Sequence, residues 1–168
     1  RKCRVQSRAE CDPSVEFGGR RFKLPVVPAN MKTVLDDAIA ETLARSEHFY
    51  VMHRFDLDSV AFARRMRKLG LFVSISAGVR DSDRQAIDRL AAEGVGADYI
   101  TIDIAHGHAE SVRAMIEHIK TRLPKTFVIA GKFSRQMIAG NDENQLKEMA
   151  SRGAKINAKP DLAAFRAS

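Results

Sequence analysis

Polar and charged residues stand at the ends of several apolar runs in this sequence. Arg54 follows the run 48–53, Asp103 follows the run 99–102, and Gly107 comes shortly after Asp103. A guanidinium can bind phosphate or carboxamide groups through charge-assisted hydrogen bonds, and a glycine lets a loop approach a ligand closely. The pattern indicates a ligand-binding site. The alternative is a structural role for each residue, with Arg54 as a surface arginine and Asp103 as a helix cap.

Groups for nucleophilic or metal chemistry are sparse. The two cysteines, Cys3 and Cys11, precede the first apolar run, and their spacing matches no zinc or redox motif. His106 and His108 stand two residues apart, but no third ligand completes a metal motif around them. We therefore predict no catalytic residue and no metal site in this chain.

Strand-like and helix-like segments alternate along most of the sequence. Short β-branched runs predict strands, and apolar residues spaced by three or four predict helices. Ser82 is placed to cap the third helix. The predicted strands are 24–31, 48–55, 71–79, 99–105 and 126–131, and the predicted helices are 33–45, 59–69, 83–93, 110–123 and 144–152.

The alternation predicts an α/β fold with a parallel sheet. The strands are nearly continuous apolar runs, as expected when helices cover a sheet, and the order fits either an open doubly wound sheet or a (β/α)8 barrel. No glycine-rich G-x-G-x-x-G turn follows the first strand to favour the open sheet. Polar residues gather instead at the carboxyl ends of the strands, where barrel enzymes build their sites.

Composition narrows the class of protein further. The chain has 168 residues and a net charge of +7, and no run of it is apolar enough to suggest a membrane span or signal peptide. The basic residues are spread out, and the densest group, 64–68, fits a solvated helix face. Aromatic residues are few and Trp is absent, so we expect no nucleic-acid partner. We expect a cytoplasmic protein whose positive charge suits anionic small molecules.

Several segments, in order, resemble one enzyme family. The segments are the leader 2–12 and the strand-like runs 24–31, 49–55, 99–108 and 127–131. They are similar to the start of the barrel in the GMP reductase and IMP dehydrogenase family, and most similar to GMP reductases. The resemblance implies a partial (β/α)8 TIM-type barrel of about five parallel strands over residues 1–131, followed by a divergent helical tail over 132–168.

The resemblance also implies a chemistry. GMP reductases use NADPH to convert GMP to IMP, through a covalent bond between a cysteine and the purine ring. That cysteine sits on a glycine-rich loop after the sixth strand, and this sequence has no such loop. The cofactor-binding residues implied by the resemblance are Ser7, Arg8, Arg54, Asp103, Ile104, Ala105 and Gly107. The residues implied to lie beside a purine nucleotide such as GMP or IMP are Asn30, Met31 and Ser76.

Two function classes follow from these observations. One is an NADPH-dependent GMP reductase by descent, incomplete or inactive alone because the cysteine loop is absent. The other is a non-catalytic nucleotide-binding or half-barrel association module, for which a homo-oligomer is an expected assembly. After Gly131 the family pattern stops, which fits a truncated or recombined product, a short paralogue or an engineered fragment.

Overall fold

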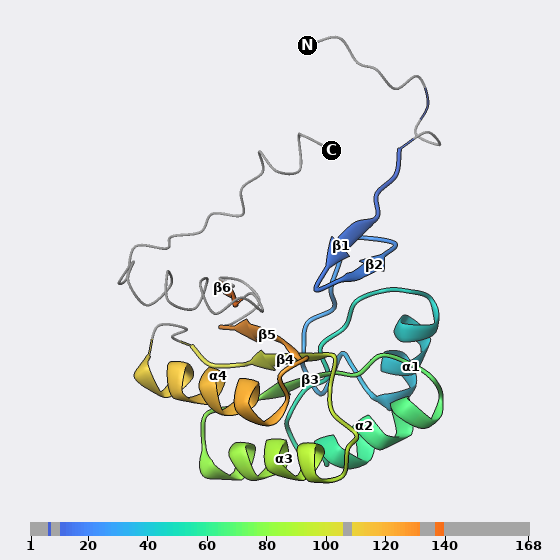
Figure 1. Ribbon diagram of the computed structural model, residues 1–168. Coiled ribbons are helices and arrows are strands. Elements are labelled where there is room, and N and C mark those ends of the chain that lie inside the picture. The colour runs from blue at the N-terminus through green and yellow to red at the C-terminus, as the bar shows by residue number, and fades with distance from the viewer. Residues whose placement is uncertain (1–6, 8–10, 106–108, 132–136, 140–168) are drawn as a thin grey trace, which may run out of the picture.

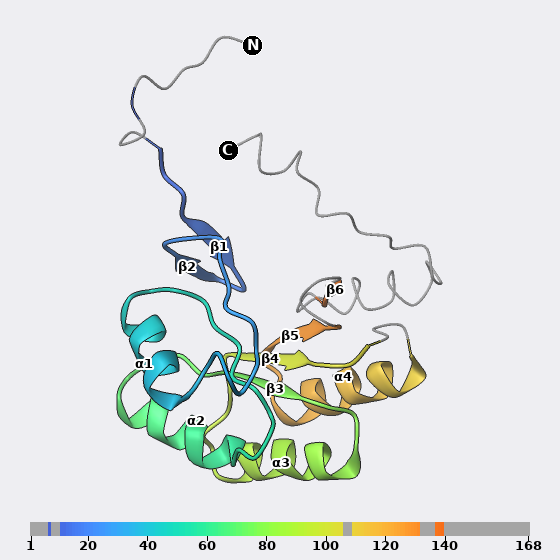
Figure 2. The same ribbon diagram turned by 180° about the vertical axis from the view of Figure 1, so that it is seen from behind.

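The structure, a computed structural model, is a parallel sheet with helices packed along one side of it (Figures 1 and 2). It describes residues 7, 11–105, 109–131 and 137–139. The strands are β1 (Val15–Phe17), β2 (Arg20–Phe22), β3 (Ser74–Ala77), β4 (Tyr99–Ile102), β5 (Phe127–Ala130) and β6 (Met137–Ala139). The helices are α1 (Asp37–Arg45), α2 (Ser59–Lys68), α3 (Asp81–Ala92) and α4 (Glu110–Arg122).

The main sheet has the predicted parallel core. β3, β4 and β5 lie side by side in that order and are parallel. Nearly all of their side chains are buried, and helices cover one face of the sheet (Figure 1). This arrangement confirms the partial α/β barrel and the three strands predicted within 71–79, 99–105 and 126–131.

Two predicted strands are largely absent. The run 24–31 enters no β-ladder, and the run 48–55 contributes only an isolated parallel bridge between Met52 and Ile75. Pro25 and Pro28 explain the first difference, because proline cannot donate a ladder hydrogen bond and interrupts a central strand. Without a paired neighbour on that side, the second run keeps just two ladder hydrogen bonds, from Met52 N to Ser74 O (3.1 Å) and from Ser76 N to Met52 O (2.9 Å).

A further strand appears where none was predicted. β6 pairs antiparallel with β5, with Ile138 opposite Ile129. The helix predicted over 144–152 lies outside the described residues. The sequence 137–139 is a three-residue apolar segment, too short for its periodicity to separate strand from helix.

Four of the five predicted helices are confirmed, and two of them, α1 and α3, begin at other residues than predicted. α1 begins at Asp37 rather than at residue 33, because the Asp36 carboxylate caps it by accepting from Ile39 N at 2.8 Å. α3 begins at Asp81 rather than at residue 83, which places Ser82 inside the helix. The prediction that Ser82 caps this helix is therefore wrong. None of the described helices is long and apolar enough to cross a membrane.

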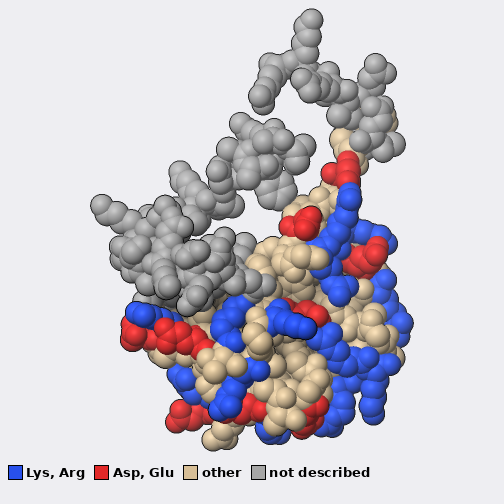
Figure 3. All heavy atoms as spheres, viewed as in Figure 1, with Lys and Arg blue, Asp and Glu red and all other residues tan. Residues whose placement is uncertain are grey.

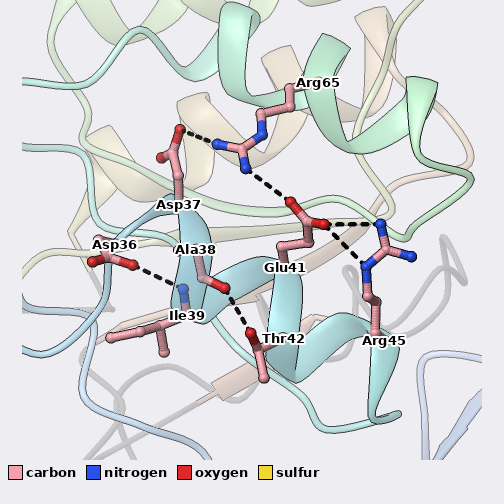
Figure 4. A network of polar contacts seen from close by, with 8 residues as sticks. All are labelled: Asp36, Asp37, Ala38, Ile39, Glu41, Thr42, Arg45 and Arg65. Carbon is pink, nitrogen blue, oxygen red and sulfur yellow. Dashed lines mark hydrogen bonds and ion pairs between the residues drawn. The ribbon is translucent and has the colours of Figure 1, made fainter.

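An ion-pair network fixes α1 against α2 (Figure 4). The Arg65 guanidinium donates to Asp37 at 3.1 Å and to Glu41 at 2.8 Å. Glu41 also accepts from Arg45, one turn further along α1. Hydrogen bonds from Arg45 and Arg65 lower the pKa of Glu41. The groups are partly exposed, so each pair stabilises the fold only slightly, but together they set the relative position of the two helices.

The basic residues of α2 are solvated, as predicted, and they are also neutralised. Arg64 pairs with Glu93, and Arg67 pairs with Asp98. Figure 3 shows blue side chains gathered over the α1 and α2 side of this face, with red ones interleaved across the surface. Most of the positive charge of α2 is therefore paired with carboxylates of the same fold.

Aromatic rings fill the amino-terminal end of the parallel sheet. Tyr99, the first residue of β4, lies 5.0 Å from Phe49, 5.8 Å from Phe127 and 6.0 Å from Phe72, measured between ring centroids. Phe17 of β1 stacks on Tyr99 at 5.9 Å. Such ring contacts add stabilisation beyond that of the buried area. The cluster therefore holds the β1–β2 hairpin against the sheet.

Two glycines shape this hairpin. Gly18 and Gly19 join β1 to β2 with φ of +58° and +77°, the conformation that a two-residue hairpin turn requires. A Cβ on Gly18 would lie 2.6 Å from Cε1 of Tyr99. Gly18 is thus needed both for the turn and for the close contact with the ring.

Tyr99 gives the fold a predictable alkaline sensitivity. Its hydroxyl donates to Phe17 O at 2.7 Å, and burial raises its pKa to about 12 from 10.0. Between these two values the unfolded chain has lost the tyrosine proton while the folded chain keeps it, so the free energy of unfolding falls as pH rises. We expect Tyr99→Phe to weaken this decline, as measured by urea denaturation at several pH values from 8 to 12. A decline of equal slope in the variant would contradict the assignment; Tyr50, also buried with a raised pKa, supplies the remaining slope.

Candidate functional site

A hollow lies at the carboxyl ends of the parallel strands. It has a volume of about 440 Å³, within the range of ligand sites. Its walls come from the segment after the Met52 bridge, from the β3–α3 loop and from the segment after β4. The lining residues are Arg54, Phe55, Gly78, Val79, Arg80, Asp83, Asp103, Ile104 and Ala105.

Arg54 combines a partly buried charge with an unsatisfied donor. Its Nε is buried and has no hydrogen-bond partner among the described residues. Its guanidinium carbon lies 4.9 Å from the centre of the Phe55 ring, a cation–π contact that orients the group. A buried donor without a partner costs about 1–3 kcal/mol. The hollow therefore offers a place where an acceptor would stabilise Arg54.

The preceding residue, His53, is packed in the interior. Its exposed fraction is 6%, and its Nδ1 has no hydrogen-bond partner among the described residues. His53 does not line the hollow in the described part of the chain. This placement favours a packing or orienting role.

The β3–α3 loop is held in a tight backbone arrangement. The Asp83 carboxylate accepts a hydrogen bond from Arg80 N at 3.0 Å, so it caps the start of α3. A Cβ on Gly78 would lie 2.6 Å from Oδ2 of Asp83. Glycine is therefore required at residue 78 for Asp83 to reach the backbone of Arg80. The contact fixes where the Arg80 side chain leaves the loop.

Asp103 stands directly after β4. Its amide donates to Ala77 O at 2.8 Å, which continues the sheet's hydrogen bonding by one residue. The residue is partly buried and lines the hollow with Ile104 and Ala105. No described ion pair neutralises its carboxylate. Asp103 therefore presents a negative charge to the same hollow as Arg54.

Four of the predicted site residues meet at the hollow: Arg54, Asp103, Ile104 and Ala105. Ser76 lies inside β3, buried, and its hydroxyl donates to Met52 O at 2.7 Å. Within the described part of the chain, neither Asn30 nor Met31 is among the lining residues, and Met31 is 55% exposed. Ser7 is exposed, while Arg8, Gly107, His106 and His108 lie outside the described residues. The geometry thus groups Arg54 with the three cofactor candidates after β4, and none of the substrate candidates is among the described lining residues.

Sequence reasoning missed the lining residues of the β3–α3 loop. Gly78 and Val79 end the predicted strand 71–79 and Arg80 follows it, just as Asp103 lies near the end of the predicted strand 99–105. Their position after a parallel strand was the available signal. Phe55, the last residue of the second predicted strand, also lines the hollow and is 48% exposed.

The residues that line the hollow favour ligand binding over covalent catalysis. Two guanidiniums and two carboxylates stand beside the apolar surfaces of Phe55, Val79 and Ile104, a combination suited to a ligand with both charged and apolar parts. The described lining residues include no thiol, hydroxyl or imidazole nucleophile. Cys11, the one cysteine within the described residues, is exposed and precedes β1.

Comparisons with known proteins identify the class of this barrel. The fold matches the crystal structure of inosine 5'-monophosphate dehydrogenase from Legionella pneumophila with a TM-score of 0.64 over 76% of this chain and 39% of that one, at 23% identity. The family model for the IMP dehydrogenase / GMP reductase domain matches residues 5–156. The chain therefore belongs to the IMP dehydrogenase / GMP reductase family.

Among curated proteins the chain is similar to bacterial GMP reductases. It is 75% identical over 131 residues to GMP reductase of Leptothrix cholodnii and 62% identical over 131 residues to that of Acidovorax ebreus. It is 56% identical over 131 residues to GMP reductase of Staphylococcus carnosus. These matches cover 77–78% of this chain, which spans about 40% of the length of each relative.

The contact between Gly78 and Asp83 can be tested by a double-mutant cycle. We expect Gly78→Ala to lower the free energy of unfolding by about 1–3 kcal/mol, because the added Cβ overpacks the carboxylate. Asp83→Ala should cost about 0.5–2 kcal/mol through the lost cap. In the Asp83→Ala background the first change should cost little, since the clash is gone. Urea denaturation of all four proteins measures the coupling; strictly additive costs would show that the two residues do not constrain each other.

Proposed function

We propose that this chain is the cofactor-binding part of a GMP-reductase-like barrel and binds NADPH without turning over GMP on its own. The observation that carries the proposal is the meeting of Arg54 and Asp103, from separate segments, at one hollow at the carboxyl ends of the strands. The similarity to GMP reductases supports the same reading. In barrel enzymes that end of the sheet holds the chemistry.

The hollow fits a nicotinamide cofactor by its chemistry. The unsatisfied Nε of Arg54 suits a phosphate or carboxamide oxygen, and Ile104 and Val79 suit the flat face of a ring. When bound, such a cofactor supplies a hydride. The residues proposed to hold it are Arg54, Asp103, Ile104, Ala105 and Gly107, with Ser7 and Arg8 at the adenosine end.

The proposed contacts to a purine nucleotide involve Asn30, Met31 and Ser76. Ser76 already donates its hydroxyl proton to Met52 O, so its oxygen would act only as an acceptor toward a nucleotide. Asn30 is partly buried and Met31 exposed, which lets both contact a ligand without opening the core. The three residues would orient the purine beside the cofactor hollow.

Turnover needs a group that this chain does not supply at the hollow. In the family a cysteine thiolate attacks the purine ring, and positioning cannot replace a covalent step. The two cysteines, Cys3 and Cys11, both precede β1 in the sequence. The chain's residues can bind and orient both ligands, whereas the nucleophile is absent from the strand-end loops.

We expect the purified chain to bind NADPH and to show no oxidation of NADPH when GMP is added. Binding is followed by nicotinamide fluorescence, and turnover by absorbance in the nicotinamide band. The variant Cys3→Ser/Cys11→Ser is the control. Turnover that survives this variant would overturn the mechanism, and turnover lost in it would show that the nucleophile lies upstream of β1.

Association with a second half barrel is a second candidate function. The run 24–31 enters no ladder, and Leu24 and Val26 are 40% and 63% exposed. Exposed apolar residues beside an unpaired segment form a surface that favours contact with another chain.

This second function makes its own prediction. We expect the chain to self-associate in sedimentation velocity, and Val26→Glu to shift it toward monomer because a carboxylate would be buried at the contact. Leu69→Glu, at an exposed apolar position that caps the carboxyl end of α2 outside this run, is the matched control and should not change the sedimentation coefficient. A wild-type chain that stays monomeric over the same concentration range would rule this function out.

A further inference from the structure

Arg80 is the basic residue among the described lining of the hollow that the resemblance does not assign. We propose that Arg80, together with Arg54, binds the pyrophosphate of the dinucleotide cofactor; this inference rests on the proposed function. Arg80 lines the hollow from the β3–α3 loop, and Arg54 lines it from the segment after the Met52 bridge. The two guanidiniums reach one space from different parts of the chain.

The first argument comes from charge pairing. Eight arginines of the described residues make ion pairs with carboxylates: Arg21, Arg45, Arg64, Arg65, Arg67, Arg89, Arg113 and Arg122. Within the same part of the chain, four arginines make none, namely Arg20, Arg54, Arg80 and Arg84, and of these Arg54 and Arg80 line the hollow. An arginine left without a carboxylate in a hollow keeps its full charge for a ligand. The hollow therefore holds two guanidiniums that the fold itself does not use.

The second argument concerns the neighbouring carboxylate. Asp83 lines the hollow too, but one of its oxygens is engaged with Arg80 N at 3.0 Å. This bond positions the Arg80 backbone and leaves the guanidinium free to turn toward the hollow. The carboxylate therefore anchors the loop that presents Arg80.

The third argument is the order of groups around the hollow. Asp103 and Ile104 follow β4, and Arg80 follows β3, the adjacent strand. A dinucleotide has a flat ring with a sugar at one end and a doubly charged pyrophosphate next to it. Asp103 suits the sugar hydroxyls as an acceptor, and two guanidiniums suit two phosphates, which they bind in bidentate fashion. The negative and positive groups of the hollow thus match successive parts of one ligand.

Ligand binding to the whole chain tests this proposal. We expect Arg80→Ala to raise the Kd of NADPH and of NADH alike by about 10-fold or more, because both share the pyrophosphate and a charged hydrogen bond is lost. Arg80→Lys should recover part of the affinity. Arg84→Ala, on the same helix but outside the lining of the hollow among the described residues, should change neither Kd. Inorganic pyrophosphate should compete with NADPH for the wild-type chain and much less for Arg80→Ala.

The outcomes separate this inference from the proposed function. A wild-type chain that binds neither cofactor would overturn both. Wild-type binding with an unchanged Kd in Arg80→Ala would overturn only the role of Arg80. A loss confined to NADPH would also overturn it, since that pattern would place Arg80 at the phosphate that NADH lacks. Circular dichroism of each variant establishes that the fold is intact.

Discussion

The contact between the Tyr99 ring and the β1–β2 hairpin is the constraint on which the sheet depends. Tyr99 begins β4, and its ring meets Phe17 and leaves no space for a Cβ on Gly18. Its hydroxyl also satisfies Phe17 O in a region away from water. Ring packing and the hydrogen bond together close the amino-terminal end of the sheet, where an open half barrel would otherwise expose its core. The parallel core of β3, β4 and β5 can then bury nearly every side chain.

Closing one end of the sheet leaves the other end available for a ligand. The strands are parallel, so aromatic residues at their starts and polar residues after their ends lie on opposite sides of the core. Tyr99 and Asp103 show this division within one strand, since one begins β4 and the other follows it. The aromatic packing lies at the amino ends of the strands. The charges of Arg54 and Asp103, which no described ion pair neutralises, lie at the carboxyl ends.

Helices and strands that have long periodic or apolar patterns were predicted from the sequence. Strands whose formation depends on hydrogen bonding to a neighbouring strand were not. The four described helices and β3, β4 and β5 carry clear local patterns. The run 24–31 has an apolar pattern without a ladder, because strand pairing depends on a neighbour and on amides that proline lacks. The hairpin carried a readable signal, two glycines between short alternating runs, which went unused. Arg80 was missed although it follows the third predicted strand, because its residue type alone does not distinguish it from the many surface arginines.

Charge explains why the hollow differs from the remainder of the surface. Elsewhere most of the described arginines pair with carboxylates, as Arg65 does with Asp37 and Glu41. At the hollow, Asp83 is engaged with the backbone, and the guanidiniums of Arg54 and Arg80 have no described carboxylate partner. The two guanidiniums therefore stand beside the Asp103 carboxylate where solvent is partly excluded, which strengthens the effect of each charge on a ligand. These charges lie at the carboxyl ends of the strands, opposite the aromatic cluster at their amino ends.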